Sequence, residues 1–258
     1  MAGSNRKLII LQDRDMRLLR ELSVMRVVDR EQAKIVAGFG STTRANARLL
    51  ALTQGQFLHR FFWGSVGGAR KALYSLSPRG AEAAGVPYRR PRRGQGQILA
   101  IDSLTAHQLT INEIYCALKY PPASAAAAQF VRWASFQEPI AGTVLIPDGY
   151  AEVQSSGKIL SLFFEIDMGS EGRKVWEGKV RAYLSFAASG RHAEQFHQPQ
   201  FRVSVVTPSD ARLRAVRGAT AAITDKIFRF TTLERIRHEG FRTAIWLRPV
   251  GDNPEALL

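Results

Sequence analysis

The chain has 258 residues, of which 45% are hydrophobic, so it is long enough for two domains and can bury a core. Its single cysteine, Cys116, excludes an intramolecular disulfide and a multi-cysteine zinc site, and it favours a reducing compartment, with the cytoplasm as the expected location. The apolar run at residues 8–11 is too short for a signal peptide, and no later run approaches a membrane span. We therefore expect neither secretion nor a membrane partner.

Positive charge is concentrated in the N-terminal part of the chain. Residues 1–100 carry 18 Lys and Arg against 6 Asp and Glu, which gives +12, whereas residues 101–258 carry 18 against 16, which gives +2. A polyanion is the expected partner of a surface of this kind, and double-stranded DNA is the obvious candidate. Solvated charge that serves only solubility is the alternative.

The N-terminal part predicts three helices followed by a hairpin. Helical spacing of apolar residues predicts helices over residues 12–27, 30–37 and 42–54. Asp29 and Ser41 are the expected N-caps of the second and third helices. Strands are expected over residues 56–63 and 70–77, around a glycine-rich tip at 64–68, and a short helix over 78–84.

The third helix separates into a buried and an exposed face. Ala45, Leu49 and Leu52 form its apolar stripe, and short polar side chains and arginines lie away from it. Such an outer face suits insertion into a DNA major groove. The predicted DNA-binding residues are Thr43, Arg44, Asn46 and Arg48 on this helix and Arg70 and Lys71 beside the hairpin tip.

Helix, turn, helix and basic hairpin in this order resemble a winged helix, and the passage Arg48-Leu-Leu-Ala-Leu-Thr-Gln-Gly-Gln-Phe-Leu58 resembles its recognition-helix-to-wing segment. Winged helices also serve as protein-docking modules, which remains an alternative. The arginine-rich segment that follows is interpreted as a linker, either tracking a phosphate backbone or simply solvated. Its four arginines are Arg89, Arg90, Arg92 and Arg93.

The remaining residues predict an α/β domain. The expected domains are a DNA-binding domain at 1–86, the linker at 87–97, an α/β domain at 98–250 and a tail at 251–258. The expected strands of the second domain cover residues 130–136, 146–155, 158–167, 201–206, 227–231 and 243–247, and the expected helices cover 105–120, 172–188, 208–222 and 233–239. Helix, three strands, helix and strand is an α/β order that predicts a mixed sheet.

A hairpin within this domain brings acidic residues together. Ser156-Gly157 is a two-residue turn signal, and with that turn Ser155 faces Lys158 and Asp148 lies opposite Glu165. Strand alternation then places Asp148, Glu165 and Asp167 on one face and only apolar residues on the other, which we interpret as the core face.

Carboxylates clustered at a sheet edge indicate a Mg²⁺ site, because this ion prefers oxygen ligands and offsets charge that develops on a phosphodiester. Asp148 and Glu165, with Asp167 or Glu113, are the candidate ligands. An ordinary solvated sheet face also carries acids across a hairpin, and this alternative stays open.

Pro147-Asp148 followed by Glu165-Ile-Asp167 and a helix resembles the restriction-endonuclease-like PD-(D/E)XK nucleases. That resemblance implies catalytic roles for Asp148 and Glu165, and a lysine at the position that Asp167 occupies here. On the following helix Lys179 falls within the apolar arc and points toward the sheet, whereas Lys174 faces solvent. Lys179 is therefore a candidate for the missing lysine, or it simply extends along the aromatic stripe.

The winged helix, the arginine linker, Asp148-Gly-Tyr150 and Phe163-Phe-Glu-Ile-Asp-Met-Gly-Ser-Glu171 together resemble the replication-relaxation family of plasmids and integrative elements. The resemblance implies a DNA-handling protein in replication, maintenance or transfer of a mobile element, with a nuclease-like second domain. The first alternative is an active Mg²⁺-dependent endonuclease or nickase. The second is an adaptor without DNA chemistry that docks replication or conjugation proteins, and a homodimer stays open.

Overall fold

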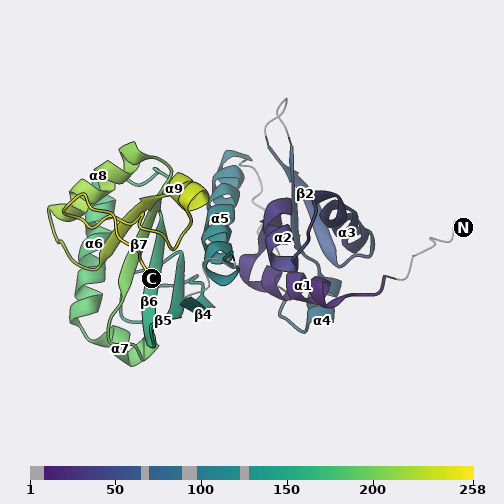
Figure 1. The fold of residues 1–258 in the computed structure, drawn as a ribbon, viewed down its shortest axis with the longest axis horizontal. Coiled ribbons are helices and arrows are strands. Elements are labelled where there is room, and N and C mark those ends of the chain that lie inside the picture. The colour runs from purple at the N-terminus through teal and green to yellow at the C-terminus, as the bar shows by residue number, and fades with distance from the viewer. Residues whose placement is uncertain (1–8, 65–69, 89–97, 123–127) are drawn as a thin grey trace, which may run out of the picture. The chain divides into compact units, whose positions relative to one another are not determined.

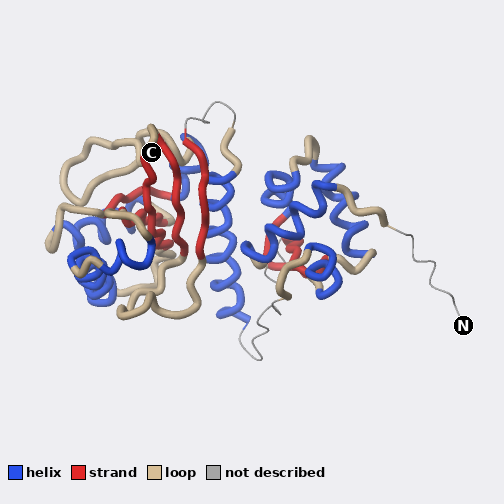
Figure 2. The backbone as a smooth tube through the Cα atoms, turned by 90° about the horizontal axis from the view of Figure 1, so that it is seen from below, coloured by secondary structure: helices blue, strands red, loops and turns tan. Residues whose placement is uncertain are grey.

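A computed structural model describes residues 9–64, 70–88, 98–122 and 128–258. The chain divides into two compact units, Met1–Cys116 and Ala117–Leu258. Each unit has a sheet of its own and helices around it (Figures 1 and 2). The expected linker at 87–97 lies almost wholly outside the described residues. Within the described parts of the chain, no helix is long and apolar enough to cross a membrane.

The first unit contains helices around a small antiparallel sheet. Its elements are α1 (Asp13–Met25), β1 (Val27–Asp29), α2 (Arg30–Ala37), α3 (Thr42–Gln54), β2 (Leu58–Trp63), β3 (Lys71–Leu76), α4 (Pro78–Ala84) and most of α5 (Ile98–Lys119). The sheet order is β1-β3-β2. The three helices and the hairpin lie where the sequence predicts them, whereas the three-residue strand β1 is too short to show an alternation and was not predicted.

Local chemistry explains how α2 and α3 begin. The Asp29 carboxylate accepts a hydrogen bond from the Gln32 backbone amide at 2.8 Å, and the Ser41 hydroxyl accepts one from the Arg44 amide at 3.2 Å. Between the two helices Gly38 adopts a left-handed conformation (φ 67°), which costs a glycine little. Both predicted N-caps are confirmed.

Helix α5 joins the first unit more closely than the predicted boundary at residue 98 implies. The Gln32 side-chain amide donates to the Leu109 carbonyl at 2.7 Å, and the Asn112 amide donates to the Met25 carbonyl at 3.1 Å. These bonds satisfy a backbone carbonyl within α5 and another at the end of α1. The division into units accordingly falls at Cys116, inside the helix that was expected to open the second domain.

The second unit is a five-stranded mixed sheet with helices. Its elements are β4 (Ala128–Ala134), β5 (Gly149–Ser155), β6 (Lys158–Ile166), α6 (Arg173–Ala188), α7 (Arg191–Phe196), β7 (Arg202–Thr207), α8 (Asp210–Ala221), β8 (Phe228–Thr232) and α9 (Leu233–Glu239). The strands lie in sequence order, antiparallel from β4 to β6 and parallel from β6 to β8. Helices α6 and α8 lie together on one side of the sheet (Figure 1).

The C-terminal region differs from two expectations. The strand predicted over 243–247 is wrong: this segment turns and makes only isolated bridges, Phe230 to Leu247 and Trp246 to Glu255. Residues 251–258 are not a free tail, because Glu255 pairs with Trp246 and Leu257 is buried. The last residues are thus held against the sheet by backbone hydrogen bonds and apolar burial.

The β5–β6 hairpin has the predicted register. Gly149 pairs with Phe164 and Ser155 with Lys158, and both turn residues have positive φ, 50° at Ser156 and 77° at Gly157, as a tight primed turn requires. A Cβ on Gly149 would lie 2.2 Å from the Trp133 ring, so only glycine fits there. The glycine of the Asp-Gly-Tyr motif therefore has a packing role.

The faces of this hairpin do not divide into core and surface as expected. Tyr150 and Phe163, on the face assigned to the acids, are fully buried in a core cluster with Trp176 and Val180 of α6. The apolar face is buried as well. Because α6 and α8 cover the first face, any carboxylate on it must find partners inside the protein.

Candidate DNA-binding face and acidic cluster

The outer face of α3 is open to solvent. Thr43, Arg44 and Asn46 are exposed, and Ala45, Leu49 and Leu52 on the opposite side are fully buried. The apolar stripe anchors the helix, and the side chains of Thr43, Arg44 and Asn46 lie in solvent. Among the residues that the structure describes, none forms an ion pair with the Arg44 guanidinium.

Arg48, also predicted to contact DNA, is engaged inside the unit. Its guanidinium donates to Asp15 Oδ1 at 2.9 Å and to the Ile10 carbonyl at 2.7 Å, and it pairs with Asp15 Oδ2. The Asp15 side chain has no exposed surface. Arg48 therefore neutralises a buried carboxylate that also closes the capping box at the start of α1. The acidic partner lies 33 residues away, so helical spacing gave no signal of it.

The two basic residues beside the hairpin tip, Arg70 and Lys71, also differ in their contacts. Arg70 is exposed, whereas Lys71 pairs with the N-cap residue Asp29. Arg89, Arg90, Arg92 and Arg93 lie outside the described residues. Two arginines that the sequence reasoning did not select, Arg14 and Arg17, line a hollow of about 440 Å³ between the start of α1 and the end of α2. The sequence could have indicated this pair, because residues three apart on a helix lie on the same face.

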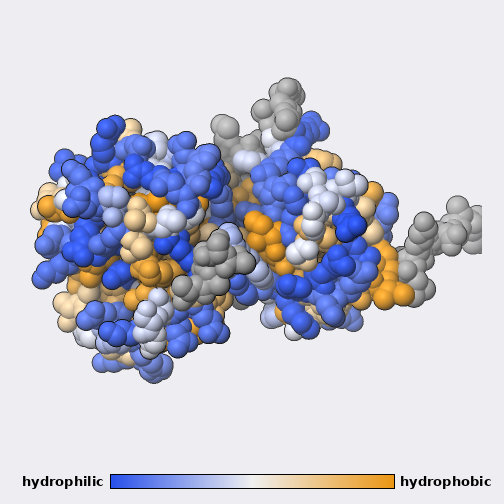
Figure 3. Space-filling model, viewed as in Figure 1, coloured by the Kyte–Doolittle hydropathy of each residue, from blue (hydrophilic) through white to orange (hydrophobic). Residues whose placement is uncertain are grey.

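Hydrophilic residues cover most of the molecular face seen in Figure 3, and hydrophobic ones form separate patches. This distribution is ordinary for a water-exposed surface. Arg44 and Arg70 are among the exposed arginines of the first unit, and their exposed side chains are accessible to an external phosphate.

In the second unit, the expected catalytic residues form what we call the acidic cluster: Asp148, Glu165 and Asp167, with the cations Lys179 and Arg212. The entry to β5 and the end of β6 position the carboxylates. Asp148 precedes β5, and its Oδ2 accepts a hydrogen bond from the Ile166 amide at 2.7 Å. Its charge acts on Glu165 across the hairpin, as the predicted register requires.

Glu165 is almost completely buried, with 3% of its side chain exposed. Lys179 Nζ donates to its Oε2 at 2.8 Å, and the Tyr183 hydroxyl donates to its Oε1 at 2.6 Å. Burial, helped by the Asp148 charge and opposed by Lys179, raises the Glu165 pKa to about 7. Burial alone would lower the Lys179 pKa, but the charges and hydrogen bonds of Glu165 and Glu171 together outweigh burial, and the pKa is raised.

The orientation expected for the two lysines of α6 agrees with these contacts. Lys179 reaches the sheet and also bonds to Glu171 Oε1 at 3.0 Å, whereas Lys174 is exposed. The ammonium group lies 5.8 Å from the Trp176 ring, so the stem does follow the aromatic stripe while the charge reaches Glu165. Lys179 thus extends along the aromatic stripe, as one alternative expected, and its role as the missing lysine of a nuclease site stays a prediction.

Asp167 has a different partner. The Arg212 guanidinium donates to its Oδ2 from Nε at 3.0 Å and from Nη2 at 2.7 Å, and the Gly169 amide donates to its Oδ1 at 2.7 Å. Arg212 also donates to the Glu171 carbonyl at 2.6 Å. Sequence reasoning missed Arg212, which lies in the first turn of α8 and comes to Asp167 only because β7 lies beside β6.

The acidic cluster does not fit a Mg²⁺ ion as it stands. Within the described residues, no three His, Cys, Asp or Glu side chains are grouped as metal ligands. Both oxygens of Glu165 and both of Asp167 already accept hydrogen bonds. The two cations supply the positive charge that a metal would bring. Glu113, the other candidate ligand, falls within the first unit.

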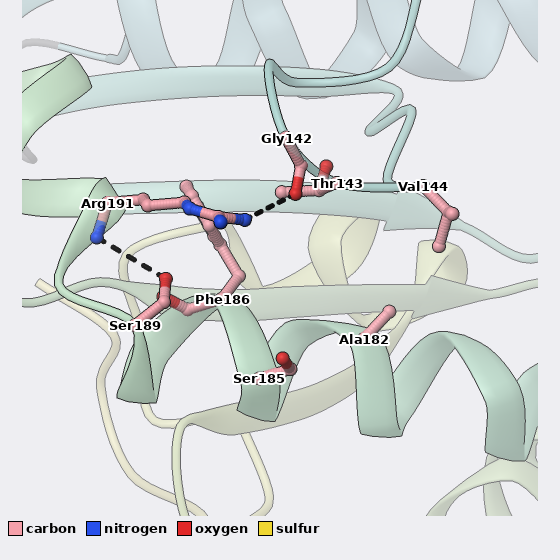
Figure 4. Close-up of a pocket in the computed structure, with 8 residues that line it drawn as sticks. All are labelled: Gly142, Thr143, Val144, Ala182, Ser185, Phe186, Ser189 and Arg191. Atoms are coloured by element: carbon pink, nitrogen blue, oxygen red, sulfur yellow. Dashed lines mark hydrogen bonds between the residues drawn. The ribbon is translucent and has the colours of Figure 1, made fainter.

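The second unit has two further features, a cavity beside α6 and a buried histidine, and neither is centred on an acidic side chain. A cavity of about 400 Å³ lies between the loop at Gly142–Val144 and α6, where Arg191 donates to the Gly142 carbonyl (Figure 4). His192 lies among the rings of Phe163, Phe186 and Phe196, and burial lowers its pKa. Neither arrangement supplies a nucleophile or a poised base.

Comparison with known proteins adds one match. The model of the replication-relaxation family matches residues 16–198, which reach from α1 through α7 and span both the α3 face and most of the acidic cluster. Arg212 lies beyond the matched stretch. The same comparisons found no match among curated proteins or among solved structures.

Proposed function

The chain belongs to the replication-relaxation family, and from this premise we propose that it binds duplex DNA of a plasmid or other mobile element through its first unit. Family membership suggests a role related to plasmid replication. The observation that carries the proposal is the outer face of α3, where Thr43, Arg44 and Asn46 are exposed on a helix whose apolar residues are buried on its other side.

The arrangement around α3 supports this assignment. Helix, turn, helix and antiparallel hairpin follow one another in the order α2, α3, β2, β3, which is the order of a winged helix. Arg70 beside the hairpin and Arg14 and Arg17 near the turn add exposed positive charge for phosphate contacts. We assign α3 to the major groove and the arginines around it to the backbone.

The test is duplex binding as a function of salt, measured by the fluorescence anisotropy of a labelled blunt duplex. Each phosphate that the protein neutralises contributes about −0.9 to the slope of log K against log salt concentration, so affinity falls steeply between about 50 and 200 mM salt. Binding that is absent, or that does not change with salt, would remove the proposal and leave the protein-docking adaptor as the better function.

Cleavage of DNA by the second unit is the second candidate. It is favoured by the position of Lys179, which reaches Glu165 from α6 although Asp167 occupies the place of the usual lysine. The order β4, β5, β6, α6, β7, with only the short helix α7 between the last two, is also compatible with the three strands, helix and strand of a restriction-endonuclease-like domain. In that case Asp148 and Glu165 would have to exchange hydrogen bonds made within the fold for the ion, and Lys179 would be the lysine beside it.

Supercoiled-plasmid nicking with Mg²⁺ or Mn²⁺ tests this candidate. Activity that Glu165→Gln and Asp148→Asn abolish, and that the exposed variant Lys174→Ala retains, would establish it. Nicking that is equal in all four proteins indicates contamination. If the wild type leaves the plasmid intact with both ions, the acidic cluster has a structural role, as its internal ion pairs favour.

A further inference from the structure

Strand β2 exposes two large aromatic side chains. Phe62 is 57% exposed and Phe61 is 38% exposed, although β2 is an edge strand of its sheet. Exposed aromatic residues on an edge strand favour unwanted association, so they are costly unless they have a ligand. In Figure 1 the outer ends of β2 and β3 project beyond α1, α2 and α3. The rings therefore stand on a projecting hairpin, on the same unit as α3.

The pairing of β2 with β3 determines what surrounds Phe62. Its cross-strand partner is Ala72, whose methyl group leaves the aromatic ring uncovered. Arg60 lies two residues earlier on the same face, with its guanidinium carbon 5.3 Å from the centre of the Phe62 ring. Arg70, two residues before Ala72 and directly before the start of β3, is exposed. The exposed Phe62 ring therefore has one arginine against it, and a second exposed arginine lies two residues from its cross-strand partner.

This combination matches one ligand chemistry. Unpaired bases stack on exposed aromatic rings, and arginines beside the ring hold the adjacent phosphates. A base inside a duplex offers no free face for stacking. The concentration of positive charge in the first hundred residues favours a nucleic acid over an apolar protein segment as the occupant.

Resting on the proposed duplex binding, we propose that Phe62, with Arg60 and Arg70, binds unpaired bases of a strand that leaves the duplex held by α3. The ligand of the first unit is then a junction between duplex and single-stranded DNA. Strand separation at an origin or at a nick generates a junction of this kind, whichever protein separates the strands.

The experiment compares the full chain bound to a blunt duplex and to a forked duplex with the same paired length and unpaired arms. We expect the fork to bind more tightly. Phe62→Ala should reduce fork affinity by about 5- to 150-fold, the range for loss of one stacked base, while blunt-duplex affinity changes less than twofold. Because Phe62 is mostly exposed, the variant should keep the wild-type circular dichroism and melting temperature.

Matched variants separate stacking from other roles of the ring. Phe62→Trp should keep the preference for the fork and Phe62→Leu should lose it, since leucine is apolar but has no ring to stack. Phe61→Ala, on the opposite face of the same strand, should keep it. A Phe62→Leu variant with full fork preference would overturn the inference, because an apolar wedge would then be sufficient.

Two further outcomes are distinguishable. Equal affinity for fork and blunt duplex, with steep salt dependence for both, overturns the junction inference and leaves duplex binding intact. Absence of binding to either DNA overturns the proposed function itself. Dimerisation in sedimentation equilibrium that Phe62→Ala abolishes would also overturn the inference, because the edge strand would then be an interface between two copies of the chain.

Discussion

Charged side chains are in opposite environments on the outer face of α3 and in the acidic cluster. On α3, Arg44 is exposed, and the helix packs through the buried residues Ala45, Leu49 and Leu52. In the acidic cluster, Glu165 and Asp167 are buried, and each is held by a cation from a helix that covers the sheet. A charge that the fold leaves in water is available to an external ligand, whereas a charge neutralised within the fold serves first to satisfy its partner.

The same contrast occurs within α3, one turn apart. Arg48→Met would leave the carboxylate of Asp15 buried without its cation, and we expect a loss of about 3–5 kcal/mol in the free energy of unfolding. Arg44→Met, the matched control on the exposed face, should stay within about 0.5 kcal/mol of wild type. Urea denaturation measures both. Equal stability of the two variants would break the distinction between a structural and a ligand-binding arginine.

Lys179→Met tests whether the acidic cluster is held by its own cations. We expect a loss of about 3 kcal/mol at about pH 8, because Glu165 is then buried without its ion-pair partner. Lys174→Met, on the exposed side of the same helix, is the control and should change little.

The loss from Lys179→Met should depend on pH with a definite sign. The Glu165 pKa is raised from 4.5 to about 7, so the folded state binds the proton more tightly than the unfolded chain, and this residue lowers stability as pH rises from 4.5 to about 7. Below its folded pKa of about 7, Glu165 is protonated in the folded protein and needs no cation. The variant should therefore be less destabilised at about pH 5.5 than at about pH 8, and the reverse order would contradict an ionised pair.

Arg44→Ala should affect binding rather than folding. If this arginine reads a base, duplex affinity falls by about 1–3 kcal/mol, and discrimination at one base-pair position relaxes. If it contacts only phosphate, affinity falls uniformly across sequences and the salt slope decreases by about 1. Anisotropy with a set of single-position duplex variants separates the two outcomes. Unchanged affinity would exclude Arg44 from the interface.

Substitution of His192 has the smallest expected effect on stability. Burial lowers its pKa, so folding disfavours the imidazolium ion, and stability is lost as pH falls below 6.5 through the folded pKa. His192→Phe should remove this acid-side loss and change stability at about pH 7.5 by no more than about 1.5 kcal/mol, since an aromatic ring replaces an aromatic ring. A variant with the wild-type pH profile would assign the acid sensitivity to another group.

The sequence by itself determined the local elements and one long-range pairing. The ends of α2 and α3 follow from Asp29, Ser41 and Gly38, whose effects are confined to a single turn. The β5–β6 register follows from the Ser156-Gly157 turn, because two residues determine which side chains face each other across the hairpin. Helical phase likewise placed Lys179 toward the sheet and Lys174 toward solvent.

Only the tertiary structure decided which charges are free. Arg48 meets Asp15, Asp167 meets Arg212 and Glu255 meets Arg229 across separations of 26 to 45 residues, and no periodicity within one element encodes such encounters. Which face of the β5–β6 hairpin is covered also depends on where α6 and α8 pack. The sequence pattern shows which residues of each helix or strand share a face. The partner of each face, and hence the cost of a charge on it, is decided when the elements pack together.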